Sequence, residues 1–171
     1  MTDFEALYRR YAGDVHRFAW YLCGDHVLAE DLTSETFARA WNAGGEIRAA
    51  TAKAYLFAIA RNCYLETLRR TGPRVGALTA PLNENLQDPA AGPDHAAAGR
   101  SELVQVMAAL AELPELDRTV LLLRARDEWS YEEIAQATGL SLAAVKVKIH
   151  RARLRLATWR AAAKKREGEK P

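Results

Sequence analysis

The residues best able to do chemistry gather near the end of the chain, where basic side chains replace acidic ones. From Val145 onward there are ten lysines and arginines, opposed only by Glu167 and Glu169. Between Ser101 and Ala144 there are three basic and eight acidic residues, so the sign of the charge reverses where the basic block begins. A basic block of this kind predicts binding to a polyanion such as nucleic acid.

The basic block has the apolar spacing of a helix. Its apolar residues recur every three or four positions, which defines the face that packs inward. The inward residues are Leu142, Val145, Ile149, Ala152, Leu156 and Trp159. Because successive residues of a helix are turned by about 100°, a second set must point outward. The outward residues are Ala143, Val147, His150, Arg151 and Leu154, with Lys146 and Lys148 on the two flanks.

The residues before this helix indicate a helix-turn-helix. Ser130 and Glu133 have the spacing of a capping box, which opens a short helix. Gly139 and Ser141 then supply a turn and the cap of the next helix. A helix of about two turns, a short glycine turn and a longer basic helix are typical of this motif.

The outward residues of the longer helix suit a DNA groove. The small side chain of Ala143 allows close approach to a major groove, where Lys146 and Arg151 can reach base edges or phosphates. A solvated face of a helical bundle would also carry such charges. The caps and the glycine turn favour DNA binding over that interpretation.

A second outward stripe lies on a predicted helix of the first half of the chain. It consists of Asp31, Ser34, Glu35 and Ala38, at spacings of three, one and three. Such a stripe is either a solvated face or a surface that binds a partner. A hydrolase using Asp31 and Glu35 is a third hypothesis, but the pair has no accompanying nucleophile or metal cluster, so we expect no enzyme.

The histidines and cysteines predict neither a metal site nor a cofactor. The four histidines, His16, His26, His95 and His150, lie on separate predicted elements. Cys23 and Cys63 fall within apolar helical patterns, which indicates small buried side chains rather than a disulfide framework. A redox role for the two thiols stays open.

Residues 71–100 divide the chain, because they hold four of its six prolines and no sustained hydrophobic period. We expect a flexible linker there, between helical modules at 1–70 and 101–171. The predicted fold class is therefore all-α, with two small helical domains. No run of about 18 apolar residues is present, and the first residues lack the character of a signal peptide, so we expect a cytoplasmic protein without membrane insertion.

The first module is predicted to contain three helices. Gly24 ends the first helix and Asp25 caps the second. The apolar stripe of the first helix is Phe4, Leu7, Tyr8, Tyr11, Val15, Phe18 and Leu22, and that of the third is Tyr55, Leu56, Ile59, Ala60 and Cys63.

Three strings of the sequence carry a further signal: AEDLTSETFARAW, AYLFAIARNCYLETLRR and LPELDRTVLLLRARDEWSYEEIAQATGLSLAAVKVKIHRARLRL. Together they resemble the bacterial extracytoplasmic-function sigma factors, the small class that keeps only the second and fourth conserved sigma regions. The resemblance implies that residues 1–70 are the region 2 bundle and residues 101–171 are the region 4 helix-turn-helix. It also implies core RNA polymerase and promoter DNA as partners, together with an anti-sigma factor.

By this resemblance, the second helix docks on the coiled-coil clamp of the largest polymerase subunit. The matching residues are Asp31, Ser34, Glu35, Phe37 and Trp41. Ser34 departs from the glutamine that is common in the family.

The third helix and the loop before it would open and read the minus-ten element, with one base extruded into a pocket near Asn62. The matching residues are Arg48, Arg61, Asn62, Arg69 and Arg70. Extruding a base costs a few kcal/mol, which contacts in the pocket must offset.

In the fourth region, the family's contacts with the minus-thirty-five element fall on the face that helical phase selects independently. These residues are Ala143, Lys146, Val147, His150 and Arg151. Val147 replaces a frequent serine and Lys148 a frequent arginine. Because valine cannot hydrogen-bond a base, we expect it to contact a thymine methyl group. The alternative function is a helix-turn-helix regulator that does not join the polymerase.

Overall fold

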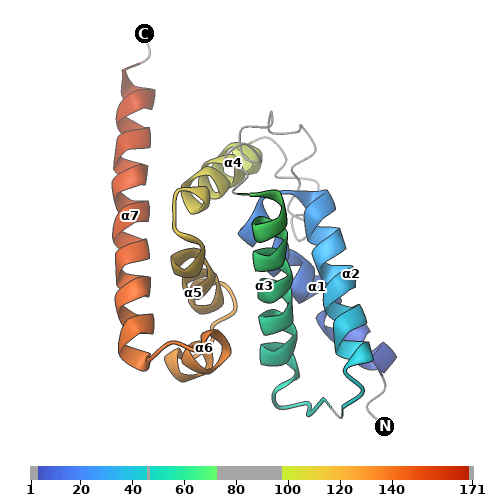
Figure 1. Cartoon of the computed structure of the whole chain (residues 1–171). Coiled ribbons are helices and arrows are strands. Elements are labelled where there is room, and N and C mark those ends of the chain that lie inside the picture. The colour runs from blue at the N-terminus through green and yellow to red at the C-terminus, as the bar shows by residue number, and fades with distance from the viewer. Residues whose placement is uncertain (1–3, 46, 73–97, 170–171) are drawn as a thin grey trace. The chain divides into compact units, whose positions relative to one another are not determined.

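The computed structural model describes residues 4–45, 47–72 and 98–169, and every regular element in these ranges is a helix (Figure 1). The chain divides into two compact units, Met1–Pro81 and Leu82–Pro171. The predicted all-α class with two small helical domains is therefore confirmed. Most of the predicted linker, residues 73–97, lies outside the described residues. No helix in the described ranges is both long and apolar enough to cross a membrane.

The first unit is a bundle of three helices that pack on one another. They are α1 (Phe4–Cys23), α2 (His26–Asn42) and α3 (Ala52–Thr71). The largest fully buried side chains of its core are Trp20, Phe18, Phe57, Leu22 and Leu56.

The corner between α1 and α2 forms as the sequence predicts. Gly24 has a positive φ of 72°, which glycine adopts without a steric penalty. Asp25 then caps α2 by accepting a hydrogen bond of 3.0 Å from the backbone N–H of Leu28. The two residues fix the angle at which α2 leaves α1.

Two aromatic residues on the predicted apolar stripes are more exposed than expected. Tyr8 of α1 and Tyr55 of α3 are both exposed. In a bundle of only three helices each helix has a narrow buried face, so rings at the edge of a stripe keep part of their surface in water. The Tyr8 ring still packs edge-on against Phe37, with 4.8 Å between the ring centroids.

The second unit contains four helices. They are α4 (Ala98–Ala111), α5 (Glu115–Ala125), α6 (Tyr131–Thr138) and α7 (Leu142–Gly168). Pro114 directly precedes α5, where its missing N–H costs no helical hydrogen bond. Helices α5, α6 and α7 all pack on one another, and α4 packs on α7. Their shared core includes Val120, Ile134, Val145, Ile149 and Ala152.

The predicted helix-turn-helix is present in α6 and α7. Ser130 Oγ accepts a hydrogen bond from the backbone N–H of Glu133 (3.1 Å), whose carboxylate accepts one from the N–H of Ser130 (2.7 Å). Gly139 ends α6 in the left-handed conformation, with φ 72°. Ser141 then caps α7 by accepting from the N–H of Ala144 at 3.1 Å. These contacts fix where the longer helix begins.

Replacing the cap of α6 should loosen that helix. Ser130→Ala removes the acceptor for one backbone N–H, and we expect it to lower the free energy of opening of α6 by about 1 kcal/mol. Hydrogen exchange of the α6 amides in the full chain measures this quantity. Ser34→Ala, an exposed serine inside α2, is the matched control and should leave α6 unchanged. Equal exchange in Ser130→Ala and the unaltered chain would contradict the role of the capping box.

Candidate nucleic-acid interface

The rotation of α7 about its axis largely follows the predicted apolar stripe. Val145, Ile149 and Ala152 are buried, whereas Leu156 and Trp159 are half-buried. Leu142 does not follow the prediction, because its side chain is exposed. It lies in the first turn of α7, at the very end of the helix, where a side chain has neighbours on one side only.

The five residues assigned to the minus-thirty-five element lie together on the opposite, exposed side of α7. Val147 has 61% of its surface exposed, which is unusual for a valine. The others, Ala143, Lys146, His150 and Arg151, are also exposed. The structure therefore brings the five side chains onto one helix face; their contact with DNA stays a prediction.

Tyr131, at the start of α6, is a neighbour that the sequence did not indicate. The Lys146 Nζ atom lies 5.7 Å from the centroid of the Tyr131 ring, and the Arg124 guanidinium carbon lies 4.7 Å from it. Cations at such distances are attracted to the face of an aromatic ring. The ring therefore helps to position Lys146 at the edge of the exposed face.

A buried carboxylate also contacts α7. Asp117 is in the first turn of α5, and none of its surface is exposed. Its two oxygens accept hydrogen bonds from Arg151 Nε and Nη2, both at 2.9 Å, and from Lys148 Nζ at 3.3 Å. Burial alone would raise the pKa of Asp117, but the hydrogen bonds from Arg151 and Lys148 outweigh it and hold the pKa below its ordinary value. Asp117 is therefore ionised at neutral pH.

In the first unit, four of the five residues assigned to polymerase docking are exposed on α2. They are Asp31, Ser34, Glu35 and Trp41, and the Trp41 side chain is 64% exposed. Phe37 departs from the prediction, because only 3% of its surface is exposed. Its ring packs against the rings of Phe4 and Tyr8, with centroid distances of 6.2 and 4.8 Å. Phe37 therefore packs beneath the exposed residues of α2 and is not itself part of the exposed surface.

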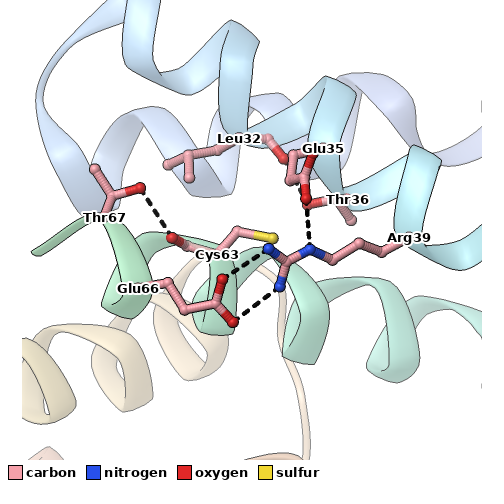
Figure 2. Close-up of polar contacts among 7 residues, drawn as sticks. All are labelled: Leu32, Glu35, Thr36, Arg39, Cys63, Glu66 and Thr67. Carbon is pink, nitrogen blue, oxygen red and sulfur yellow. Dashed lines mark hydrogen bonds and ion pairs between the residues drawn. The ribbon is translucent and has the colours of Figure 1, made fainter. Parts of the chain in front are cut away.

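Arg39 joins this surface to α3 (Figure 2). Its guanidinium donates to Glu35 at 2.6 Å and to both carboxylate oxygens of Glu66, at 2.9 and 2.7 Å. The hydrogen bonds with Glu66 and Glu35 raise the pKa of Arg39, and the bond from Arg39 lowers the pKa of Glu66. Beneath this group, burial raises the pKa of the Cys63 thiol, so Cys63 stays protonated.

The residues assigned to the minus-ten element are spread over α3 and the preceding loop. Arg48 and Asn62 are exposed and Arg61 is half-buried. Arg69 and Arg70 lie at the last turn of α3. These two arginines line a groove between α2 and α3 that Asp31, Ser34 and Glu35 also line, whereas Asn62 does not line it. One groove thus joins part of the predicted polymerase surface to part of the predicted minus-ten surface.

The described residues hold no group of three or more histidine, cysteine or acidic side chains arranged for a metal ion. Both cysteines are buried and free of a disulfide.

Both halves of the chain match known protein families. Residues 7–74 match Sigma-70 region 2, and residues 103–156 match Sigma-70, region 4. The chain therefore carries, in order, two conserved regions of the sigma-70 class of transcription factors.

Curated relatives identify the family within that class. SigE of Mycolicibacterium smegmatis, an ECF RNA polymerase sigma factor, is 33% identical over 158 residues, covering 91% of this chain and 61% of SigE. SigM of Bacillus subtilis, also an ECF RNA polymerase sigma factor, is 31% identical over 153 residues, covering 89% of this chain and 91% of SigM. The chain belongs to the extracytoplasmic-function (ECF) RNA polymerase sigma factors.

Solved structures agree with this assignment. The sigma factor RpoE from Bartonella quintana, in complex with the anti-sigma factor NepR, has a TM-score of 0.72 and 27% identity, covering 93% of this chain and 97% of RpoE. CnrH, in complex with the cytosolic domain of CnrY, has a TM-score of 0.67 and 25% identity, covering 93% of this chain and 88% of CnrH.

Sigma factors direct transcription initiation by RNA polymerase, and this is the function of the chain. A regulator that acts apart from the polymerase is not favoured, because region 2 is present together with the helix-turn-helix.

The contact between Arg39 and Glu66 can be tested by titration. Arg39→Gln removes the guanidinium that donates to Glu66 and lowers its pKa, so this pKa should rise toward its ordinary value. Because a lowered pKa stabilises the fold above the ordinary pKa, the contribution should disappear as the pH falls through the folded-state pKa. Carboxyl NMR of Glu66 measures the shift. Arg48→Gln is the control, and an unchanged Glu66 pKa in Arg39→Gln would contradict the contact.

Proposed function

We propose that the exposed face of α2 binds core RNA polymerase, while α3 and α7 contact the two elements of a promoter. The observation that supports this assignment is that one chain carries both an acidic surface and a basic surface. The first unit carries the acids Asp31 and Glu35 and an exposed Trp41 on the same helix, α2. The second presents a basic helix face after a glycine turn. Exposed aromatic rings are typical of protein-binding surfaces, and a basic recognition helix is typical of a DNA-binding one.

The minus-thirty-five element is assigned to the exposed face of α7. Lys146 and His150 can donate to base edges or phosphates, and Val147 can contact a thymine methyl group. Arg151 can donate to a base edge. All four side chains lie on the same side of the helix as Ala143, whose small size permits close approach.

The minus-ten element is assigned to α3 and the loop before it, with Arg48, Arg61, Asn62, Arg69 and Arg70 as contacts. Arg69 and Arg70 are exposed in the last turn of α3, where they can contact phosphates. Their position at the α2–α3 groove would place DNA next to the polymerase surface. This proximity supports a single site in which polymerase and the opened promoter meet.

Two promoter contacts that are each weak give a high overall affinity when one polypeptide makes both. When the first promoter element is bound, the second is presented at a high effective concentration, which depends on the length of the connection. We therefore expect domains at 1–70 and 101–171 joined by a linker at 71–100, and a promoter whose two elements have a fixed spacing.

The remaining properties follow from the family. We expect the protein to act in the cytoplasm, where polymerase and DNA meet, and to have no enzymatic activity of its own. Since RpoE of Bartonella quintana forms a complex with the anti-sigma factor NepR, we also expect an anti-sigma factor to bind this chain.

Run-off transcription with purified core polymerase tests the function. Added to core polymerase on fragments of the source genome, the chain should give discrete transcripts whose start sites follow a shared pair of upstream elements. Core polymerase without the chain should give none. Tight, sequence-specific binding of the chain to duplex DNA without polymerase, together with no transcript, would contradict the proposal.

Reversing one charge on α2 tests the polymerase surface. Asp31 is exposed, so Asp31→Lys should leave the fold intact and weaken core polymerase binding by roughly tenfold, as expected for a like charge placed in a charged interface. Fluorescence titration of labelled chain with core polymerase measures the affinity. Glu30→Lys makes the same charge change elsewhere on α2 and should bind as the unaltered chain does. Equal weakening by the two variants would indicate a general charge effect and contradict the assigned face.

A further inference from the structure

Asp117 forms an ion pair with Arg151, which is assigned to the minus-thirty-five element. Its carboxylate is fully buried in α5, where residues 117–123 are all buried. The next residue, Arg118, donates to the backbone carbonyl of Leu113 at 3.1 Å and so secures the first turn of α5. The carboxylate is therefore attached to a fully buried segment of the unit, while its partner Arg151 has a side chain that is 47% exposed.

The contact uses one edge of the Arg151 guanidinium and leaves another edge available. Nε and Nη2 donate to the two oxygens of Asp117, which is a bidentate arrangement. The N–H groups of Nη1, and the second one of Nη2, make no hydrogen bond with the described residues. These groups form the terminal edge of the guanidinium, which presents two parallel N–H donors.

Lys148, one turn before Arg151 on the same side of α7, shares the carboxylate. It donates to Oδ1 of Asp117 at 3.3 Å, and only 22% of its side chain is exposed. Asp117 thus neutralises a lysine that is mostly covered. The charge left for DNA at this point of α7 is then that of Arg151, held in one orientation.

We propose that Asp117 is a positioning residue for promoter recognition: it fixes Arg151 so that its terminal edge is presented to a guanine of the minus-thirty-five element. This inference rests on the proposed function of α7. Guanine offers two acceptors, O6 and N7, in the major groove, and two parallel N–H donors match them. An arginine fixed beforehand loses less conformational freedom on binding than a mobile one. A mobile arginine would bind phosphates of any sequence equally well.

The test measures sequence preference rather than affinity alone. Holoenzyme made from the full chain and core polymerase transcribes a promoter library in which every base pair of the upstream element is varied. The unaltered chain should prefer guanine at one base pair by about 5- to 150-fold, and Arg151→Ala should abolish that preference. Asp117→Asn should reduce the preference at the same base pair by at least roughly fivefold and leave the other positions unchanged. Glu115→Gln, which removes a charge from the same turn of α5, should change none of them.

Arg151→Lys completes the test, because lysine can still pair with Asp117 but has no planar edge. It should lose the guanine preference while keeping the thermal stability of the unaltered chain. If Asp117→Asn does not fold, Arg151→Lys alone tests the inference. Retained preference in Arg151→Lys or in folded Asp117→Asn would overturn the inference. Uniform weakening at all positions in Asp117→Asn would also overturn it, since that result indicates a phosphate contact. These outcomes differ from failure of the proposed function, in which the unaltered chain gives no transcript at all.

Discussion

The orientation of α7 about its own axis is the constraint on which promoter recognition depends. Val145, Ile149 and Ala152 are buried where α7 packs against α5 and α6, so the helix cannot rotate without exposing them. The capped start of α6 and the left-handed Gly139 fix the position at which α7 begins. Burial of these apolar residues therefore decides which polar side chains of α7 are exposed. The cost of exposing three apolar residues, a few kcal/mol, is comparable with the whole stability of a small domain.

Each unit contains an ion pair that joins two helices and includes or adjoins residues of the proposed sites. In the second unit, Asp117 of α5 holds Arg151 and Lys148 of α7. In the first, Arg39 of α2 holds Glu35 of the same helix and Glu66 of α3. Arg151 and Lys148 of the basic block, and Glu35 of the acidic stripe, are therefore each held by an ion pair. Because arginine and glutamate have many rotamers, holding them beforehand reduces the entropy lost when a partner binds.

Local sequence signals predicted the elements well, since caps, turns and helical spacing act within a few residues. Ser130 with Glu133, Gly139 and Asp25 all behave as predicted. The sequence could not predict the partners of the site residues. Asp117 and Arg151 are 34 positions apart, and Arg39 and Glu66 are 27 apart, so only the packing of helices brings them together. Phe37 shows the limit of a motif, which does not distinguish a residue on the surface from one that supports it.

The central claim, that the exposed face of α7 lies in the upstream promoter element, is tested most directly by cleavage from a tethered probe. Leu154 is exposed on the same face as Val147, and the native cysteines are buried. A Leu154→Cys chain labelled with an iron chelate should, in holoenzyme, cut promoter DNA at and beside the minus-thirty-five element. Cleavage confined to other regions, or none in a holoenzyme that still transcribes, would contradict the account.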